Sequence, residues 1–82
     1  MNIYEFIKLS EIEKGTAIWD GEFLAERFSN EQRYALYHLG EFFVEVEYNP
    51  KKNKLISLRP FKTKKLLEPY LHQIDINKLI GN

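Results

Sequence analysis

The chain has 82 residues, which allows one small globular domain over residues 1–82 that buries about 60% of the surface its unfolded form exposes. Its apolar content of 44% and aromatic content of 15% exclude an intrinsically disordered chain, and the lack of cysteine excludes a disulfide scaffold, a Cys-ligated zinc site and thiol catalysis. The net charge of zero conceals an asymmetry, because residues 1–50 carry ten acids and four bases whereas residues 51–82 carry two acids and eight bases.

Two short helices are predicted at the start of the chain. Residues 2–8 place apolar side chains at helical spacing, namely Ile3, Phe6 and Ile7. Ser10 then reads as an N-cap, and Glu13 three residues later completes a capping box. The helix that follows would end near Gly21 and would align one stripe of side chains, namely Ile12, Thr16 and Trp19.

From Glu22 onward the apolar period changes to two, which predicts strands over residues 22–28, 33–39, 41–48 and 54–61. The segments between them have the lengths and residues of hairpin loops. A two-residue loop at Gly40-Glu41 pairs Tyr37 with Val44, and a five-residue loop at 49–53 pairs Val44 with Leu58. Both hairpins then place apolar residues on one face, so an antiparallel four-stranded meander in the order 1-2-3-4 is predicted.

A C-terminal helix is predicted from an apolar stripe formed by Leu66, Leu67, Tyr70, Leu71 and Ile74. Pro69 allows two versions: the helix begins near Glu68 with Pro69 in its first turn, or a turn beginning at Thr63 is kinked there. Asp75 would cap a last turn that ends near Leu79.

The expected fold is therefore α+β: an N-terminal helical segment, a four-stranded antiparallel β-meander and a C-terminal helix packed on the sheet. The expected core comprises Leu24, Tyr37, Leu39, Phe42, Val44, Val46, Ile56, Leu58, Leu67 and Leu71.

The sheet face opposite this core is the first candidate site. The predicted register aligns Phe23, His38, Phe43 and Arg59 in one row, and the whole face offers a candidate partner-binding set of Phe23, Arg27, Tyr34, His38, Phe43, Glu45, Glu47 and Arg59. Aromatic and arginine side chains dominate interface energetics, which makes Phe43 the expected anchor. Three alternatives stay open: a terminal helix covers this face, cross-strand ion pairs solubilise it, or it holds a small molecule.

The second candidate is a basic stretch without an intervening acid. The stretch runs over residues 51–65 and contains Arg59 and six lysines. The lysines are the candidates for binding an anion or a nucleic acid, namely Lys51, Lys52, Lys54, Lys62, Lys64 and Lys65. Such a run indicates a patch for phosphate or for an acidic partner. The alternative is a solvated hairpin whose lysines protect a sheet edge from aggregation.

Little in the sequence indicates catalysis. Neither His38 nor His72 has a metal-ligating partner at helical spacing, and no Gly-rich phosphate loop or nucleophile motif occurs. We therefore predict no catalytic residue, metal or cofactor. With no apolar run near the roughly 20 residues of a membrane helix and no signal peptide at the first residues, we expect a soluble cytoplasmic protein.

The favoured function is a non-enzymatic binding or regulatory module that contacts an unidentified protein partner or associates with itself. The alternative is a nucleic-acid binder or a ribonuclease-toxin-like protein that uses residues 51–65.

Several sequence pieces resemble a family of small uncharacterised proteins from Bacteroidetes across about residues 1–80. The pieces are Leu24-Ala25-Glu26-Arg27, Tyr34-Ala35-Leu36-Tyr37, Phe43-Val44-Glu45-Val46 and Leu67-Glu68-Pro69-Tyr70-Leu71. This resemblance implies a bacterial protein and assigns no function to any residue. Over residues 41–71 the layout, with a strand ending in Arg59-Pro60-Phe61 before a Lys-rich helix start, is also similar to small ribonuclease toxins of toxin–antitoxin pairs. Those toxins are strongly basic, whereas this chain is neutral.

Overall fold

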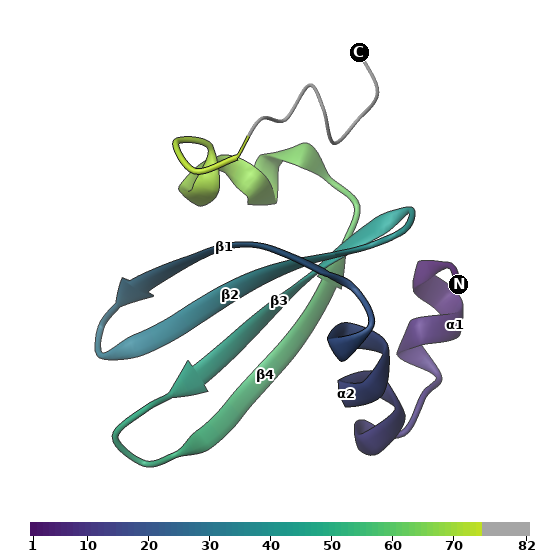
Figure 1. The fold of residues 1–82 in the computed structure, drawn as a ribbon, viewed down its shortest axis with the longest axis horizontal. Coiled ribbons are helices and arrows are strands. Elements are labelled where there is room, and N and C mark those ends of the chain that lie inside the picture. Colours follow the sequence, from purple (N-terminus) through teal and green to yellow (C-terminus); the bar gives the residue numbers. More distant parts are fainter. Residues whose placement is uncertain (75–82) are drawn as a thin grey trace.

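The computed structural model describes residues 1–74, in which two α-helices precede a four-stranded antiparallel sheet and a 3-10 helix follows it (Figure 1). The elements are α1 (Ile3–Ile7), α2 (Glu11–Trp19), β1 (Glu22–Ser29), β2 (Gln32–Leu39), β3 (Phe42–Asn49), β4 (Lys54–Phe61) and η1 (Lys64–Tyr70). The strand order β1-β2-β3-β4 confirms the predicted meander, and the α+β class is correct. No helix in this described part has the length and apolar composition needed to cross a membrane.

Both N-terminal helices begin with a capping box. In α1 the Asn2 side chain accepts from the backbone N–H of Glu5, and in α2 the Ser10 hydroxyl accepts from that of Glu13. The Glu13 carboxylate in turn accepts from the Ser10 N–H at 2.9 Å, as the sequence predicts. The backbone N–H groups of the two N-cap residues and of the two glutamates thereby gain hydrogen-bond partners.

The register of the central hairpin is the predicted one. Tyr37 lies opposite Val44 and Leu39 opposite Phe42, joined by a turn in which Gly40 takes a φ of +72°. A residue with a Cβ atom adopts this left-handed conformation only at a cost, so glycine suits the turn.

The β1–β2 hairpin departs from the prediction in two ways. The strands extend to Ser29 and Gln32, which leaves a two-residue turn at Asn30-Glu31 with positive φ at both positions, the geometry that matches strand twist. A bulge at Leu24 then shifts the register, so that Phe23 faces Tyr37 instead of His38. The predicted alignment of Phe23 with His38 is wrong for this reason.

The predicted pairing of β3 with β4 is wrong by two residues. Val46 lies opposite Leu58 and Val44 opposite Pro60. One residue of this shift arises because the loop is one residue shorter than expected. The other arises at a second irregularity, where Ile56 has no partner on β3. A shift of two preserves which face each residue occupies, so Leu58 keeps its predicted side. Ile56, expected in the core, is exposed.

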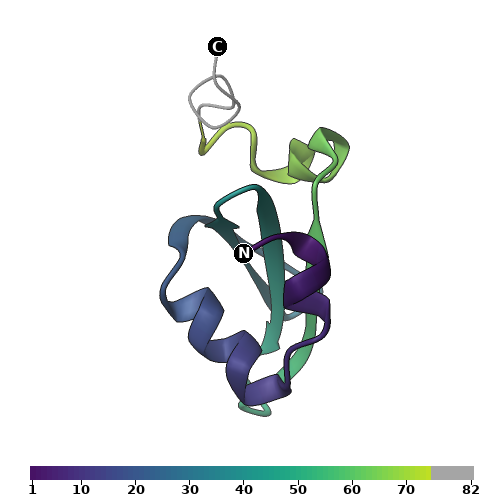
Figure 2. The same ribbon diagram turned by 90° about the vertical axis from the view of Figure 1, so that its right-hand side faces the viewer.

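The two faces of the sheet are covered by different parts of the chain (Figures 1 and 2). On the α face, the helices contribute Phe6 and Ile18 to a cluster with Phe42 and Val44. On the η face, the second cluster contains Ala25, Leu36, Phe43, Phe61, Leu67 and Tyr70. The expected core is divided between the two faces: Leu67 is fully buried as predicted, but in the η-face cluster, and the bulge turns Leu24 toward that same face, where it is partly buried. Leu71, also expected in the core, is exposed.

The C-terminal segment begins as in the second predicted version, with Thr63 as N-cap and Pro69 inside the helix, but it is a 3-10 helix that ends at Tyr70, before the predicted Leu71 and Ile74. Proline lacks an N–H and its ring clashes with the carbonyl four residues earlier, which disfavours an α-helix here. The predicted last turn from Asp75 to Leu79 lies outside the described residues.

Substitution of Val44 tests the assignment of the α face. Val44 is fully buried, and an unpaired buried carboxylate costs several kcal/mol against a total stability of about 5–10 kcal/mol. We expect Val44→Asp to abolish the cooperative thermal transition followed by circular dichroism. The matched control is Ile12→Asp, which places the same charge at an exposed position and should keep the wild-type Tm. A Val44→Asp protein that melts like the wild type would show that Val44 is not buried in the α-face cluster.

Candidate functional site

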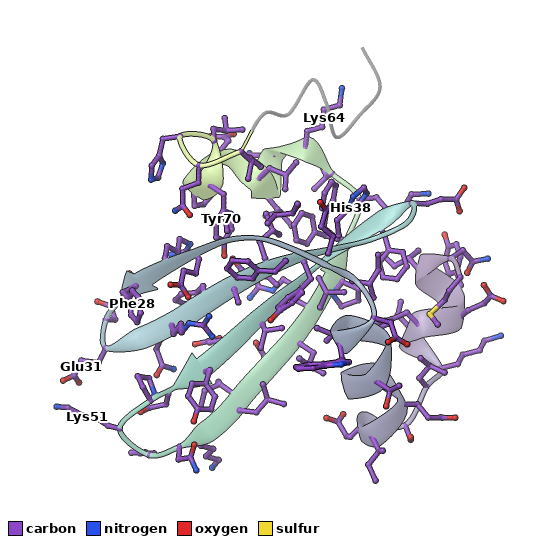
Figure 3. The ribbon with its side chains drawn as sticks, in the orientation of Figure 1. Phe28, Glu31, His38, Lys51, Lys64 and Tyr70 are labelled. Carbon is purple, nitrogen blue, oxygen red and sulfur yellow. The ribbon has the colours of Figure 1, made fainter. Side chains whose placement is uncertain are left out.

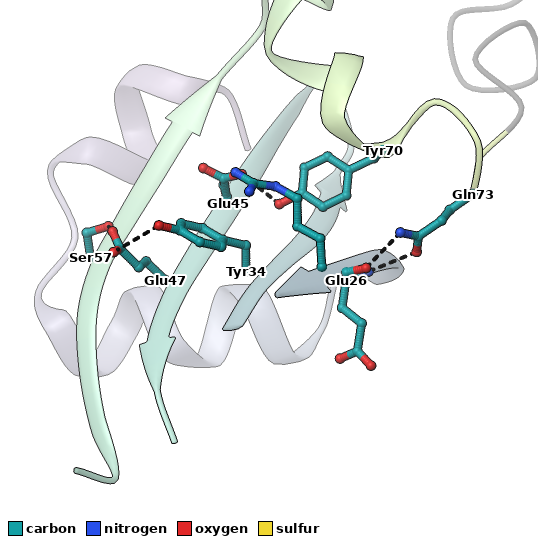
Figure 4. Close-up of polar contacts among 8 residues, drawn as sticks. Glu26, Tyr34, Glu45, Glu47, Ser57, Tyr70 and Gln73 are labelled. Atoms are coloured by element: carbon teal, nitrogen blue, oxygen red, sulfur yellow. Dashed lines mark hydrogen bonds and ion pairs between the residues drawn. The ribbon is translucent and has the colours of Figure 1, made fainter. Parts of the chain in front are cut away.

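A network of polar side chains occupies the η face next to the apolar cluster (Figure 4). At its centre the Glu45 carboxylate accepts a 2.6 Å hydrogen bond from the Tyr70 hydroxyl. The same oxygen lies 3.4 Å from Nη2 of Arg27, and only 12% of the Glu45 side chain is exposed. The contact therefore joins η1 to the sheet through a carboxylate that would otherwise be costly to bury.

A second carboxylate, Glu47, lies further along β3. One of its oxygens accepts from Gln32 Nε2 at 3.0 Å and from the Tyr34 hydroxyl at 3.2 Å, and the other accepts from the Ser57 hydroxyl at 3.2 Å. These donors come from β2 and β4, the strands on either side of β3. Because both carboxylates are held by donors on neighbouring elements, the network has a fixed arrangement of charge.

The guanidinium of Arg27 lies between two aromatic rings. Its Cζ atom is 4.1 Å from the centroid of Tyr34 and 5.5 Å from that of Tyr70. Its Nε atom is buried and has no hydrogen-bond partner among the described residues. Cation–π contacts orient the group here, and its hydrogen-bonding capacity is only partly used.

The two tyrosine hydroxyls act as hydrogen-bond donors near neutral pH. Burial, together with the hydrogen bond to Glu45, raises the pKa of Tyr70 far above its ordinary value. Burial and the nearby Glu47 carboxylate also raise the pKa of Tyr34. Within residues 1–74 no group of three or more histidine or acidic side chains is arranged to hold a metal ion. The Tyr70 and Tyr34 hydroxyls thus donate to carboxylates of β3, and the Tyr70 contact holds η1 against the sheet.

A groove opens beside this network, between β4 and η1, and is called here the η1 groove. It has a volume of about 250 Å³ and is lined by Arg27, Glu45, Arg59, Lys65, Glu68 and apolar side chains. Its three cations come from three different elements: β1, β4 and η1. The fold therefore brings together bases that are distant in sequence.

The structure joins only part of the predicted partner-binding set. Arg27, Tyr34, Glu45 and Glu47 belong to the network, and Arg59 lines the groove beside it. The expectation of an open face anchored on Phe43 is wrong, because Phe43 is only 5% exposed and packs in the η1-covered cluster.

The remaining members of that set lie at the edge of this cluster or outside it. The His38 ring stacks on Phe43 at 4.8 Å, at one end of the η face. Phe23 lies on the α face and meets Tyr37 edge-on, because of the bulge at Leu24.

The basic stretch is divided between the two ends of β4, as the labelled Lys51 and Lys64 show in Figure 3. Lys51, Lys52 and Lys54 lie at the β3–β4 turn, where Lys51 pairs with Glu31 at 2.9 Å. Lys62, Lys64 and Lys65 lie at the other end, near η1. Lys54 and Lys62 lie roughly 25 Å apart along β4, and Arg59 is the one base of the stretch between them, so the seven bases do not form one continuous patch.

An apolar surface on α2 was not among the predicted sites. Ile12 and Trp19, which the sequence places on one stripe, are 83% and 86% exposed. The helix instead buries Ile18 against the sheet. The sequence does contain a signal for this exposed surface, because Ile12 and Trp19 lie on one stripe of the helix and Ile18 lies on the adjacent stripe. A short helix can bury only one of the two stripes, so the other must be exposed.

Removal of the Tyr70 hydroxyl tests the contact between η1 and the sheet. Tyr70→Phe keeps the ring and deletes a hydrogen bond to a charged group, so we expect a loss of about 1.5–3 kcal/mol in the free energy of unfolding, measured with urea. Tyr4→Phe is the matched control, because Tyr4 is exposed, and it should leave stability unchanged. Equal stability of both variants would show that the Tyr70–Glu45 contact does not hold η1.

Stability at alkaline pH provides a further test of the same contact. Because the folded state raises the pKa of Tyr70, this residue contributes stability that is complete below its unfolded pKa of about 10 and is lost as the pH rises above it. We expect the free energy of unfolding to fall between about pH 10 and pH 12, above the unfolded pKa of tyrosine, and to fall less steeply in Tyr70→Phe. The folded state also raises the pKa of Tyr34, so Tyr34 accounts for part of the decline in stability that remains in Tyr70→Phe. Parallel curves for the two proteins would contradict this assignment.

Comparison with protein-family models, curated proteins and solved structures finds no match to this chain. The resemblances to small Bacteroidetes proteins and to ribonuclease toxins stay predictions. What the protein binds is therefore inferred from its own geometry and charge.

Proposed function

We propose that the protein is a small non-enzymatic binding module that contacts a partner protein through the exposed side of α2. The observation that carries this proposal is the exposure of Trp19 (86%) and Ile12 (83%) on one side of a helix. Seven residues make almost two full turns, so the two side chains lie about one above the other. Tryptophan is the residue type most enriched among the anchors of protein interfaces, which supports this reading.

A groove lies between α2 and the sheet and is called here the α2 groove. It has a volume of about 220 Å³ and is lined mostly by apolar side chains of the sheet, namely Ala35, Tyr37, Val46, Leu55 and Leu58, with one charge on each side, Glu11 on the helix and Arg33 on the sheet. Gly15 lines the helical side, where an added Cβ atom would meet nothing within 4 Å. The glycine thus leaves a gap on the helix between Ile12 and Trp19 that an apolar side chain of a partner can enter.

The charges around α2 indicate the chemistry of the partner. Between residues 11 and 22 the chain carries four acids and one lysine. We propose that the partner contributes a segment with apolar anchors flanked by lysine or arginine, since opposite charges steer association and fix its register. A second copy of this chain is the competing occupant, and it is an outcome of the test below.

The cellular setting belongs to the same proposal. A cysteine-free chain is suited to the bacterial cytoplasm, where disulfides do not form and an intracellular partner would be found.

A photo-crosslinking amino acid at position 12 tests the proposed interface in cells that naturally express the protein. We expect an adduct whose crosslinked peptide has apolar and basic residues, and we expect Trp19→Ala to reduce its yield at least tenfold because a hot-spot residue contributes about 2 kcal/mol or more. Trp19 is exposed, so the substitution should leave the Tm unchanged. The same crosslinker at the exposed Tyr4 of α1 is the matched control.

Sedimentation of the purified protein distinguishes the two occupants. A monomer at high concentration, together with a Trp19-dependent adduct, supports a separate partner, whereas a Trp19-dependent dimer identifies a second copy. A monomer whose crosslinks are equal at positions 4 and 12, or unchanged by Trp19→Ala, would refute an interface on α2.

A further inference from the structure

We propose that the η1 groove binds a small phosphate ester, a function independent of the partner surface on α2. Arg27 from β1, Arg59 from β4 and Lys65 from η1 all line it. The lining carries these three bases against two carboxylates, Glu45 and Glu68, and the Glu45 carboxylate already accepts from Tyr70 and Arg27, so the groove has a net positive charge.

Arg27 is positioned for this role before any ligand arrives. Its guanidinium is packed against Tyr34 and Tyr70, and its only hydrogen bond among the described residues is the 3.4 Å contact to Glu45. The Glu45 oxygen in that contact is already bound by the Tyr70 hydroxyl at 2.6 Å. Arginine presents five donors in a rigid fork that matches phosphate, and the terminal N–H groups of Arg27 that do not contact Glu45 can donate to a ligand oxygen.

Arg59 and Lys65 supply the mobile charges at the entrance. Both are exposed, and neither forms an ion pair within residues 1–74. Arg59 lies directly across from Glu45 in the register, yet Glu45 pairs with Arg27 instead. These two bases can therefore bind a ligand without first breaking an internal ion pair.

The rest of the groove restricts what the phosphate can be attached to. Phe61, Leu66 and Pro69 form an apolar wall, which favours a ligand with a flat or apolar group beside its phosphate. Glu68 also lines the groove, and its carboxylate repels a second anionic group. We therefore assign a ligand with a single phosphate and an aromatic or aliphatic substituent.

A nucleic acid fits these observations less well. Tracking a phosphate backbone requires a continuous row of bases, whereas the lysines at the β3–β4 turn lie at the far end of β4 and Lys51 already pairs with Glu31. Short groove length and separated charges favour a small ligand.

Titration with phenyl phosphate, followed by NMR chemical shifts of the backbone amides, tests this proposal. We expect saturable shifts confined to the residues around the η1 groove, competition by inorganic phosphate and no such shifts with phenol. Arg59→Gln and Lys65→Gln should each weaken binding about tenfold, the loss typical of a hydrogen bond between charged groups. The matched control is Lys54→Gln, which removes a base of the same stretch at the other end of β4 and should leave the affinity unchanged.

Two results would overturn the proposal. One is the absence of groove-localised shifts with phenyl phosphate at millimolar concentration in a folded protein. The other is equal weakening by Lys54→Gln and Arg59→Gln, together with tight binding of a single-stranded RNA oligonucleotide that weakens steeply with salt, which would assign the bases to nucleic acid. Neither result bears on the crosslinks at α2, so the two proposals can fail separately.

Discussion

The contact between Tyr70 and Glu45 determines what the η face presents to solvent. Glu45 occupies a row of the sheet whose β1 and β2 members are the buried Ala25 and Leu36, so its carboxylate needs donors from outside its own strand. The Tyr70 hydroxyl supplies one from 25 residues further along the chain, and its ring covers apolar neighbours. A surface that would otherwise expose Leu36 and Phe43 is closed in this way, and the η1 groove exists only because η1 is held there.

The covered parts of both faces lie toward the same end of the sheet, and this leaves the other end to polar contacts. There, Arg33 pairs with Glu26, Gln32 with Glu47 and Lys51 with Glu31. The exposed edge of β1 is also occupied, because the Gln73 side-chain amide donates to the Glu26 carbonyl at 2.7 Å and accepts from its N–H at 3.2 Å (Figure 4). One side chain thus imitates the peptide group of a neighbouring strand, which protects an edge that could otherwise pair with another chain.

Local chemistry is what the sequence predicts well in this protein. The capping box of Ser10 and Glu13, the Gly40 turn and the alternation through Phe42, Val44 and Val46 depend on neighbouring residues, and all three are correct in the structure. The candidate site was predictable to the same extent. Because alternation places Arg27, Tyr34, Glu45 and Glu47 on one face, their proximity follows from the meander, whereas the hydrogen bond from Tyr70 to Glu45 depends on where η1 packs.

The remaining features depend on how extra residues and extra apolar surface are accommodated. A bulge costs little and can fall at any of several positions, so neither the one at Leu24 nor the one at Ile56 follows from the pattern, although the first transfers Phe23 to the other face. In the same way, α2 has two adjacent apolar stripes, of which only one can pack against the sheet. The stripe that contains Ile18 is the one that is buried. Both proposed binding surfaces depend on features that the sequence pattern does not determine. The partner surface on α2 depends on which apolar stripe of the helix stays exposed. The η1 groove depends on the two-residue shift that places Arg59 opposite Glu45.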